Sequence, residues 1–478
     1  MSQLLLTPLF DFDPYREQRT DYLDLIKQFA SHHAFRSAVV EELELDDDFY
    51  RRPLRPEDLE FLKFQRPISE QTVSRLPSLA SNRMLLTIND LDIARLPRHA
   101  DPAEQLRFEQ FYEARNQDLG KRLRPFLESY AFSYLGNEGR DGATVPRLSD
   151  DLARLVDDER DFWRGIFELL LRNNYLEEGL RFILVQRWCL APTRRAALAR
   201  AQAAGYFAGL DEGDLPRLSG SMLGDAAIES AARMLGVARQ AHSYWQFYLP
   251  TSLAKANLLT SLAARPDRAY ALLGAAYGGE AEWLAFSLAL RQACPHLAGP
   301  LAEGEAQRAL DDLAVRWRRA AQVVLERQGP YGVARAGQGL GAVVKLAERA
   351  RWDLGEQLAW LSAIPQYCRW AQAIEHRIQA ECPNIDRETF VEPREMCSTT
   401  HVHNDHRLVV IEHGDMVFWG NLGMALSMTV GDKVLIPDGR LHGSTVVSDE
   451  CTYHQPIIPD DWIAALRAQG ARQMAVSA

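Results

Sequence analysis

The chain has 478 residues, 47% of them hydrophobic, so it can bury a large core and form roughly two to four domains. Its 54 lysines and arginines against 65 aspartates and glutamates give a net charge of −11 without a basic tract, which argues against a nucleic-acid partner. No apolar run reaches the ~20 residues that cross a bilayer, and the N-terminus lacks a signal or transit pattern. The six cysteines form no CxxC pair, so we expect a cytoplasmic protein without a membrane partner.

Residues 1–145 are predicted to form an N-terminal helical region. The sequence "DPAEQLRF" provides a cap at Asp101, a proline at Pro102 for the first turn and a capping box at Glu104. Apolar residues then recur at helical spacing from Leu119 to Tyr130, and this stripe needs a partner surface. We therefore predict one helix from Pro102 to Tyr130, and a homodimer formed through this region.

Residues 146–385 have a helical composition, rich in alanine, leucine, arginine and glutamate. Short breaks such as "APTRR", "YLPTS", "ARPDR" and "RQGPYG" divide this stretch into about eight helices, which suits one compact all-α domain. The helical period stops within residues 381–399.

Residues 390–478 are predicted to form a third domain, because after residue 398 the apolar period changes to two. The β-prone runs are short and separated by turn residues: "RLVVIEHGDMVFW", "GMALSMTV", "DKVLIPDG" and "HGSTVVSD". Such a pattern predicts a small antiparallel barrel or sandwich.

Two histidine motifs stand out in this β-prone region. His401 and His403 lie two positions apart, so on a strand they project from the same face, although this spacing arises by chance in roughly a quarter of chains of this composition. The sequence "GDKVLIPDGRLHG" also fits G-x5-P-x-G-x2-H and ends at His442. A chance match to that second pattern is on the order of one in several thousand.

Together these motifs resemble the two signature motifs of the cupin family. The resemblance implies a β-barrel in which His401, His403 and His442 bind one metal ion. Cupins often supply a glutamate four or five residues after the first motif, but Arg407 and Leu408 occupy those positions here. We therefore expect three histidines and no carboxylate ligand. A neutral three-histidine site leaves coordination positions open for an anionic substrate and O₂, which favours Fe(II), one per chain, over zinc or manganese.

Two further residues of this region are candidates for substrate binding. Arg407 either holds a substrate carboxylate or lies exposed at the barrel rim. His454, in "YHQP", is expected on a neighbouring strand, where it either contacts the metal site or forms a hydrogen bond behind it. His406 and His413 are interpreted either as loop or hairpin imidazoles in contact with solvent or as hydrogen-bonding groups behind the metal site.

The order of the three regions resembles the N-nitrosourea-forming, streptozotocin-type metalloenzyme family. In that family a helical dimerisation region precedes a heme-oxygenase-like di-iron domain that hydroxylates guanidine nitrogens, and a C-terminal iron cupin forms the N–N bond. The resemblance implies a multidomain α + β protein that is mostly α-helical, with a heme-oxygenase-like bundle and a C-terminal β-barrel cupin.

The helical domain departs from that family, whose di-iron site uses an H-x3-D-x2-H motif on a late helix. No such motif occurs here, and the nearest placement puts Gly332, Ala336 and Gly339 at its three positions. We therefore expect a domain that lacks the di-iron ligands.

Three residues remain as possible surviving ligands in the helical domain. They are Glu178, Glu229 and His242. Isolated glutamates and histidines on amphipathic helices are usually solvated or capped, which is the alternative interpretation of all three.

The leading hypothesis is a non-heme iron cupin oxygenase that forms an N–N-bonded metabolite, a nitrosamine or diazeniumdiolate. Its substrate would be a small N-hydroxylated amine or amino-acid derivative, either free or bound to a carrier protein. The alternatives are a three-histidine cupin dioxygenase that acts on a thiol or amino acid, and a non-catalytic metal-binding scaffold.

Overall fold

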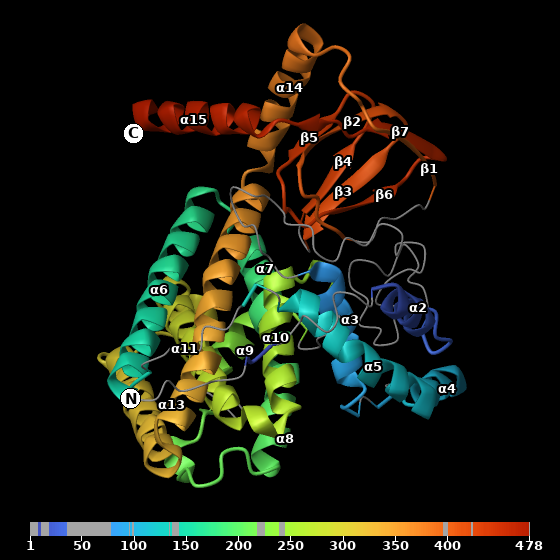
Figure 1. Cartoon of the computed structure of the whole chain (residues 1–478). Coiled ribbons are helices and arrows are strands. Elements are labelled where there is room, and N and C mark those ends of the chain that lie inside the picture. The colour runs from blue at the N-terminus through green and yellow to red at the C-terminus, as the bar shows by residue number, and fades with distance from the viewer. Residues whose placement is uncertain are drawn as a thin grey trace.

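The computed structural model shows a helical bundle that carries an antiparallel β region at one end (Figure 1). It describes residues 8–10, 19–35, 78–94, 96–97, 100–132, 134–135, 143–217, 225–238, 244–394, 400–421 and 424–477. Buried apolar side chains from helices and strands form one continuous cluster. The predicted fold class, mostly helical with a C-terminal β domain, is confirmed. Among these residues, no helix combines the length and hydropathy of a membrane span.

The described helices of the N-terminal region are α2 (Arg19–Ala30), α3 (Leu79–Asp90), α4 (Pro102–Phe111) and α5 (Ala114–Ala131). Asp101 caps α4 as expected, by accepting a hydrogen bond from Ala103 N at 3.1 Å. The prediction of one helix from Pro102 to Tyr130 was wrong, because the chain breaks at Glu113, whose backbone is extended. Glu113 instead hydrogen-bonds His32.

The apolar stripe of α5 is buried within the chain. Phe126 stacks on Tyr22 of α2 with ring centroids 4.3 Å apart. Gly120 brings α5 so close to α3 that a Cβ atom there would lie 2.6 Å from Leu91 Cδ1. The stripe therefore provides no free dimer surface, and the homodimer stays a prediction without that argument.

The main bundle contains the remaining helices before the β region. They are α6 (Val145–Arg172), α7 (Leu176–Arg187), α8 (Ala191–Ala203), η3 (Glu212–Asp214), α9 (Asp225–Met234), η5 (Trp245–Phe247), α10 (Pro250–Ala263), η6 (Pro266–Arg268), α11 (Ala269–Ala293), α12 (Pro295–Ala298), α13 (Glu305–Leu361) and α14 (Ile364–Glu381). Prolines open α8 and α10, where a missing backbone N–H costs no helical hydrogen bond. The expected break at "RQGPYG" is a kink inside α13, at Gly329 with φ 63°.

The β region consists of two antiparallel sheets. Its strands are β1 (Thr389–Pro393), β2 (His406–His413), β3 (Met416–Asn421), β4 (Met424–Met428), β5 (Lys433–Ile436), β6 (Gly443–Val446), β7 (Glu450–His454) and β8 (Ile457–Ile458). One sheet has the order β1-β7-β2-β5, with β8 also paired to β2, and the other has the order β4-β3-β6. The four predicted runs contain β2 to β6. The sequence interpretation missed β1, β8 and the terminal helix α15 (Asp460–Ser477).

The β region packs directly on the end of the bundle. Helix α13 reaches its base, and α14 continues along strand β5 (Figure 1). Trp360, near the end of α13, donates from Nε1 to Leu435 O at 3.3 Å. The boundaries 1–145, 146–385 and 390–478 stay predictions, since these contacts join the regions they separate.

Candidate metal centre

The three predicted ligands come together where two segments of the β region cross. Residues His401 and His442 form an isolated antiparallel bridge, with N···O distances of 2.9 and 3.1 Å. Gly439 donates from its backbone N to His403 O at 2.8 Å and has a φ of 73°, a conformation that favours glycine. The turn of the second motif therefore brings His442 back against the first motif.

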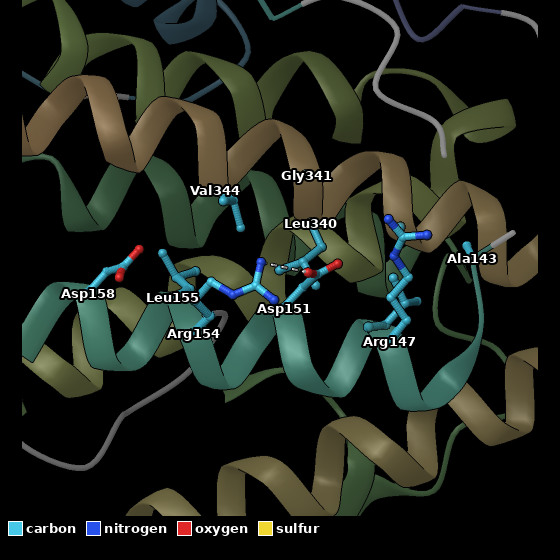
Figure 2. Close-up of a pocket in the computed structure, with 11 residues that line it drawn as sticks. Ala143, Arg147, Asp151, Arg154, Leu155, Asp158, Leu340, Gly341 and Val344 are labelled. Carbon is cyan, nitrogen blue, oxygen red and sulfur yellow. Dashed lines mark ion pairs between the residues drawn. The ribbon is translucent and has the colours of Figure 1, made fainter. Parts of the chain in front are cut away.

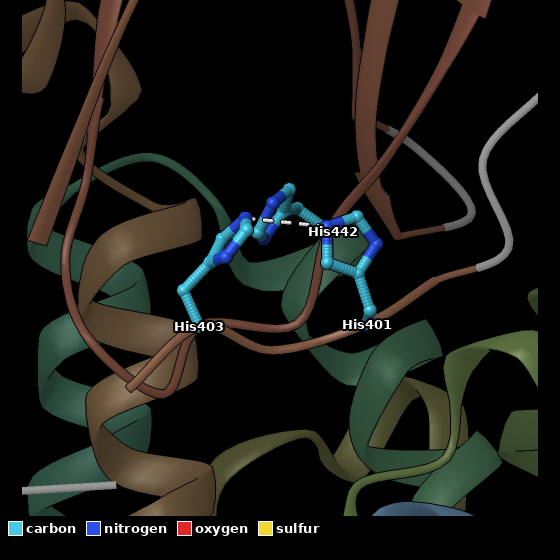
Figure 3. Close-up of side chains that lie close together, drawn as sticks. All are labelled: His401, His403 and His442. Atoms are coloured by element: carbon cyan, nitrogen blue, oxygen red, sulfur yellow. Dashed lines mark hydrogen bonds between the residues drawn. The ribbon is translucent and has the colours of Figure 1, made fainter. Parts of the chain in front are cut away.

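The three imidazole rings face one another (Figure 3). The Nε2 atoms of His401 and His403 lie 3.2 Å apart, and each of the three histidines offers a ring nitrogen within 4.8 Å of the others. Two nitrogen ligands of one ion at bond lengths near 2.1 Å are separated by about 3.0 to 3.4 Å. The spacing of this pair therefore fits a shared metal ion.

His442 supplies the strongest sign that this cluster binds a ligand. Its side chain is 2% exposed, and Nδ1 donates to Arg440 O at 2.8 Å. That hydrogen bond fixes the tautomer and leaves a lone pair on Nε2, as in metal-binding histidines. His442 Nε2 is buried and has no hydrogen-bond partner among the described residues. A buried, unsatisfied lone pair is costly unless a ligand uses it.

Burial also keeps the rings of His403 and His442 neutral. Desolvation, with contributions from His401 and Arg407, lowers the pKa of His403 to about 2. Desolvation and the two neighbouring histidines lower the pKa of His442 well below its ordinary value. Neutral imidazoles have the free lone pairs that metal coordination requires.

A known protein is similar to the chain over nearly its whole length. It is a nitrosourea synthase from Streptomyces achromogenes subsp. streptozoticus, 26% identical over 460 residues that cover 92% of this chain and 96% of the relative. The chain is a relative of the nitrosourea-forming enzymes. The resemblance seen in the sequence is thereby confirmed. No family model matches the chain.

In this relative of nitrosourea synthase, Arg407 is held by neighbouring acids. Its guanidinium binds Asp405 at 2.9 and 3.2 Å, pairs with Glu388, and donates to Gln455 O at 3.0 Å. Burial acts to lower the pKa of Arg407, but the hydrogen bonds that its guanidinium donates to Asp405 and Glu388 outweigh burial and raise the pKa overall. Its role in binding substrate stays a prediction, and two carboxylates already balance its charge.

His454 lies on β7, outside the histidine triad. Its Nε2 pairs with Glu412 and its Nδ1 lies 2.9 Å from Thr389 Oγ1. Glu412, the first glutamate after the first histidine motif along the sequence, is thus paired with a different histidine. A substrate contact by His454 also stays a prediction.

The positions where the di-iron motif was sought lie in a tight helix contact. A Cβ atom on Gly339 of α13 would lie 1.7 Å from Ala271 O of α11, and one on Gly274 would lie 1.9 Å from Ala336 O. Backbones this close leave no room for a longer side chain at Gly339. Gly332 has a similarly tight surrounding, with Val324 Cγ1 at 2.7 Å from a Cβ atom placed there.

The other proposed survivors are not brought together. Glu178 is partly exposed at the start of α7, Glu229 is exposed on α9, and His242 lies outside the described residues. Neither residue belongs to a potential metal cluster within the described part of the chain. The loss of the di-iron ligands stays a prediction.

Sequence reasoning missed two carboxylates buried inside the bundle. Glu159 on α6 contacts Arg351 at 3.0 Å and Arg187 at 3.5 Å, while Glu282 on α11 pairs with Lys255 and lies 3.5 Å from Arg187. Burial acts to raise the pKa of Glu282, but Lys255 and Arg187 outweigh it and lower the pKa. Cations therefore occupy the space around these acids that a metal would need. The sequence carried no signal for this, because the pairs join distant helices.

A second group with metal-ligand chemistry lies in the N-terminal region. His32, His33 and Glu113 place ligand atoms within 4.8 Å of one another. His32 Nδ1 accepts a hydrogen bond from Ala34 N at 3.3 Å, so the neutral ring carries its proton on Nε2, which faces Glu113 at 2.8 Å. The Nε2 atom of His32 is thus already used in the hydrogen bond to Glu113.

A surface groove runs between α6 and α13 (Figure 2). Leu148, Leu155 and Leu340 provide apolar lining, and Arg154 pairs with Asp151 at 3.6 Å. The groove contains no member of the histidine triad.

Proposed function

We propose that this chain catalyses formation of an N–N bond in the biosynthesis of a small metabolite, and that the histidine triad is its metal centre. The observation that carries the proposal is the unpartnered Nε2 atom of buried His442 beside two further imidazoles, in a chain related over its length to a nitrosourea synthase. A nitrosourea contains an N–N bond, so a relative of its synthase supports this class of chemistry.

The donor set favours Fe(II), one ion per chain, with O₂ as the co-substrate. Three neutral imidazoles and no carboxylate leave the ion its full charge and open positions. Fe(II) held there would bind the substrate and O₂ next to each other and supply electrons for oxidation at nitrogen. We propose an N-hydroxylated amine or amino-acid derivative as the substrate, free or bound to a carrier, because its oxygen and nitrogen can chelate such an ion.

The residues around the triad orient the ligands. The Arg440 carbonyl fixes the tautomer of His442, and the ring of Phe418 lies 5.4 Å from the His442 ring in a stacked arrangement. Phe418 is buried, so its ring excludes water from that side of His442. Arg407, balanced by two acids, contributes little net charge to the site.

The helical domain is proposed to lack a di-iron centre, so another oxygenase would supply the N-hydroxylated substrate. We further propose that the chain forms a homodimer in the cytoplasm. Light scattering of the intact chain at several concentrations tests the assembly, and the mass of a single chain throughout would contradict the dimer.

The decisive assay supplies the Fe(II)-loaded protein with O₂ and a panel of ¹⁵N-labelled N-hydroxylated amino acids and guanidines, free and carrier-bound. Mass spectrometry should detect a product in which two labelled nitrogens are joined. His442→Ala should abolish this product, while His413→Ala, an exposed histidine of the same region, should retain it. Turnover of thiols or unmodified amino acids alone would favour the dioxygenase alternative. Metal binding without any turnover would favour the scaffold alternative.

A further inference from the structure

Side chains from the helical bundle hold the backbone next to both halves of the histidine triad. The triad is built from two segments that are far apart in sequence, one containing His401 and the other His442. The residues immediately before them are Thr400 and Leu441, and each is buried. Each of these two residues makes hydrogen bonds to the helical part of the chain.

Thr400 is bound by residues of α3 and η5. Arg83 of α3 donates from Nη1 to Thr400 O and from Nη2 to Thr400 Oγ1, both at 2.7 Å. Gln246 of η5 accepts from Thr400 N at 3.0 Å through Oε1. Arg83 also donates to Gln246 O at 3.2 Å, so the three residues form one buried network. The N–H, the carbonyl and the hydroxyl of Thr400 are therefore all fixed by the bundle.

Leu441 is bound by one residue of α13. Gln357 accepts from Leu441 N at 2.9 Å through Oε1 and donates to Leu441 O at 3.0 Å through Nε2. The Gln357 side chain has no solvent exposure. Its primary amide thus pairs with both backbone groups of one residue, in the way that a neighbouring strand would.

The contact between Gln246 and Thr400 is itself supported by further hydrogen bonds within the bundle. Gln186 of α7 donates to Phe247 O at 2.7 Å and accepts from Leu249 N at 2.9 Å, on the residues that follow Gln246. The segment that carries Gln246 is therefore anchored to α7 by another amide pair.

We propose that Arg83, Gln246 and Gln357 are positioning residues of the metal centre. Through their hydrogen bonds to Thr400 and Leu441, they fix where the two ligand-bearing segments lie relative to each other. In this arrangement the helical bundle is the template on which the β region aligns His401 and His442. The proposal rests on metal binding by the triad, which is part of the proposed function.

The test compares substitutions that remove only the amide hydrogen bonds. Gln357→Met and Gln246→Met keep a side chain of similar length but cannot pair with the backbone. The matched control is Gln338→Met, because Gln338 is also a buried glutamine of α13 but bonds to Arg335 of the same helix at 2.9 Å. All variants are made in the full chain, and Co(II) is titrated under anaerobic conditions.

We expect Gln357→Met and Gln246→Met to bind Co(II) about 10-fold more weakly, the lower end of the range for residues that orient metal ligands. The visible absorption bands of the bound Co(II) should also change, because the ligand geometry changes. Gln338→Met should match the wild type in affinity and spectrum. Gln357→Glu, which keeps the acceptor for Leu441 N, should lie between the wild type and Gln357→Met.

Thermal unfolding, measured for every variant, separates alignment from general stability. If the folded variants bind Co(II) with wild-type affinity and spectrum, the positioning role is overturned and metal binding by the triad stands. Variants that unfold before metal is added would assign these residues to folding, which also overturns the proposal. A wild-type chain that binds no Co(II), or binds it equally well after His442→Ala, would instead reject the metal centre itself.

Discussion

The metal centre and the middle of the helical bundle differ in whether their buried polar groups have partners. At the centre, His442 Nε2 is buried without a partner among the described residues. In the bundle, the buried carboxylates of Glu159 and Glu282 are paired with cations from other helices. A buried group that lacks a partner indicates a missing ligand, whereas buried groups that satisfy one another indicate a structural network.

The strongest test of this difference is the metal content of the two regions. Fe(II)-loaded wild-type protein should contain about one iron per chain, because one site combines converging imidazoles with an unpartnered lone pair. His401→Ala or His442→Ala should abolish binding, measured by elemental analysis after removal of free metal. The exposed residue His413 provides the control, and His413→Ala should leave the iron content unchanged.

Two or more irons per chain would show that the bundle also binds metal, which would contradict the difference between the two regions. A transient visible absorption band on adding O₂ to the reduced protein would contradict it as well, if Glu178→Ala removed that band.

The charge network in the bundle should be sensitive to loss of one member. Lys255→Met removes a cation that pairs with buried Glu282, so we expect the free energy of unfolding to fall by about 3 to 4 kcal/mol. Denaturant titration at pH 7 measures the change. The double variant Lys255→Met/Glu282→Leu removes both charges and should recover most of the loss. Equal stability of Lys255→Met and wild type would mean that the pair carries no structural role.

Any atom added where α11 and α13 are in contact should lower the stability of the fold. Gly339→Ala would place a Cβ atom 1.7 Å from Ala271 O, so the helices must separate, at a cost of about 3 kcal/mol. Gly165 of α6 is the matched control, because nothing lies within 4 Å of a Cβ atom there. Gly165→Ala should stabilise the chain by about 0.5 to 1 kcal/mol, through helix propensity. A Gly339→Ala variant as stable as wild type would show that the bundle can open enough to admit side chains at this position.

Asp353 of α13 combines features of both regions, because it is buried and only partly satisfied. Thr251 donates to its Oδ2 at 2.8 Å, while Oδ1 has no hydrogen-bond partner within the described residues. Burial raises the pKa of Asp353 to about 6, although the Thr251 hydrogen bond and the charge of Arg440 act to lower it. The folded state therefore holds a proton that the unfolded state releases near pH 4.

Because the pKa of Asp353 is higher in the folded state than in the unfolded state, ionisation of its buried carboxyl lowers the free energy of unfolding above pH 6. This destabilisation disappears below about pH 4, where the carboxyl is protonated in both states. Asp353→Asn removes the titration, so the stability of the variant relative to wild type should increase by about 2 kcal/mol between pH 4 and pH 7. Denaturant midpoints at several pH values measure this difference. A difference that is constant with pH would show that Asp353 titrates as an exposed acid does.

Much of the candidate site was accessible from the sequence because its motifs are local. The spacing of His401 and His403 and the turn that ends at His442 identified the three residues that the structure brings together. The surroundings were less accessible. Arg407 was weighed as a free cation at a rim, but its partner Glu388 lies in a segment that the sequence placed before the β-prone runs.

The fold, like the site, was predictable from the sequence in some parts and not in others. Helix breakers and the change of apolar period from helical to two identified the mostly helical chain and its β end, as the kink at Gly329 and the strands β2 to β6 show. Strand β1 was missed because a strand of five residues at a sheet edge, largely exposed, has no alternating apolar pattern. The single helix expected from Pro102 was interrupted at Glu113, where hydrogen bonding to His32 accompanies an extended backbone.

The sequence by itself determined which three histidines can bind a metal at the β end and where most of the helical and extended segments lie, because these properties depend on spacing along the chain. Only the tertiary structure decided which partner each polar group has. Glu159 meets Arg351, and Gln357 meets the residue before His442, across separations of 192 and 84 positions. Such pairs depend on how helices pack against one another and against the β region, and no local pattern of residues encodes that packing.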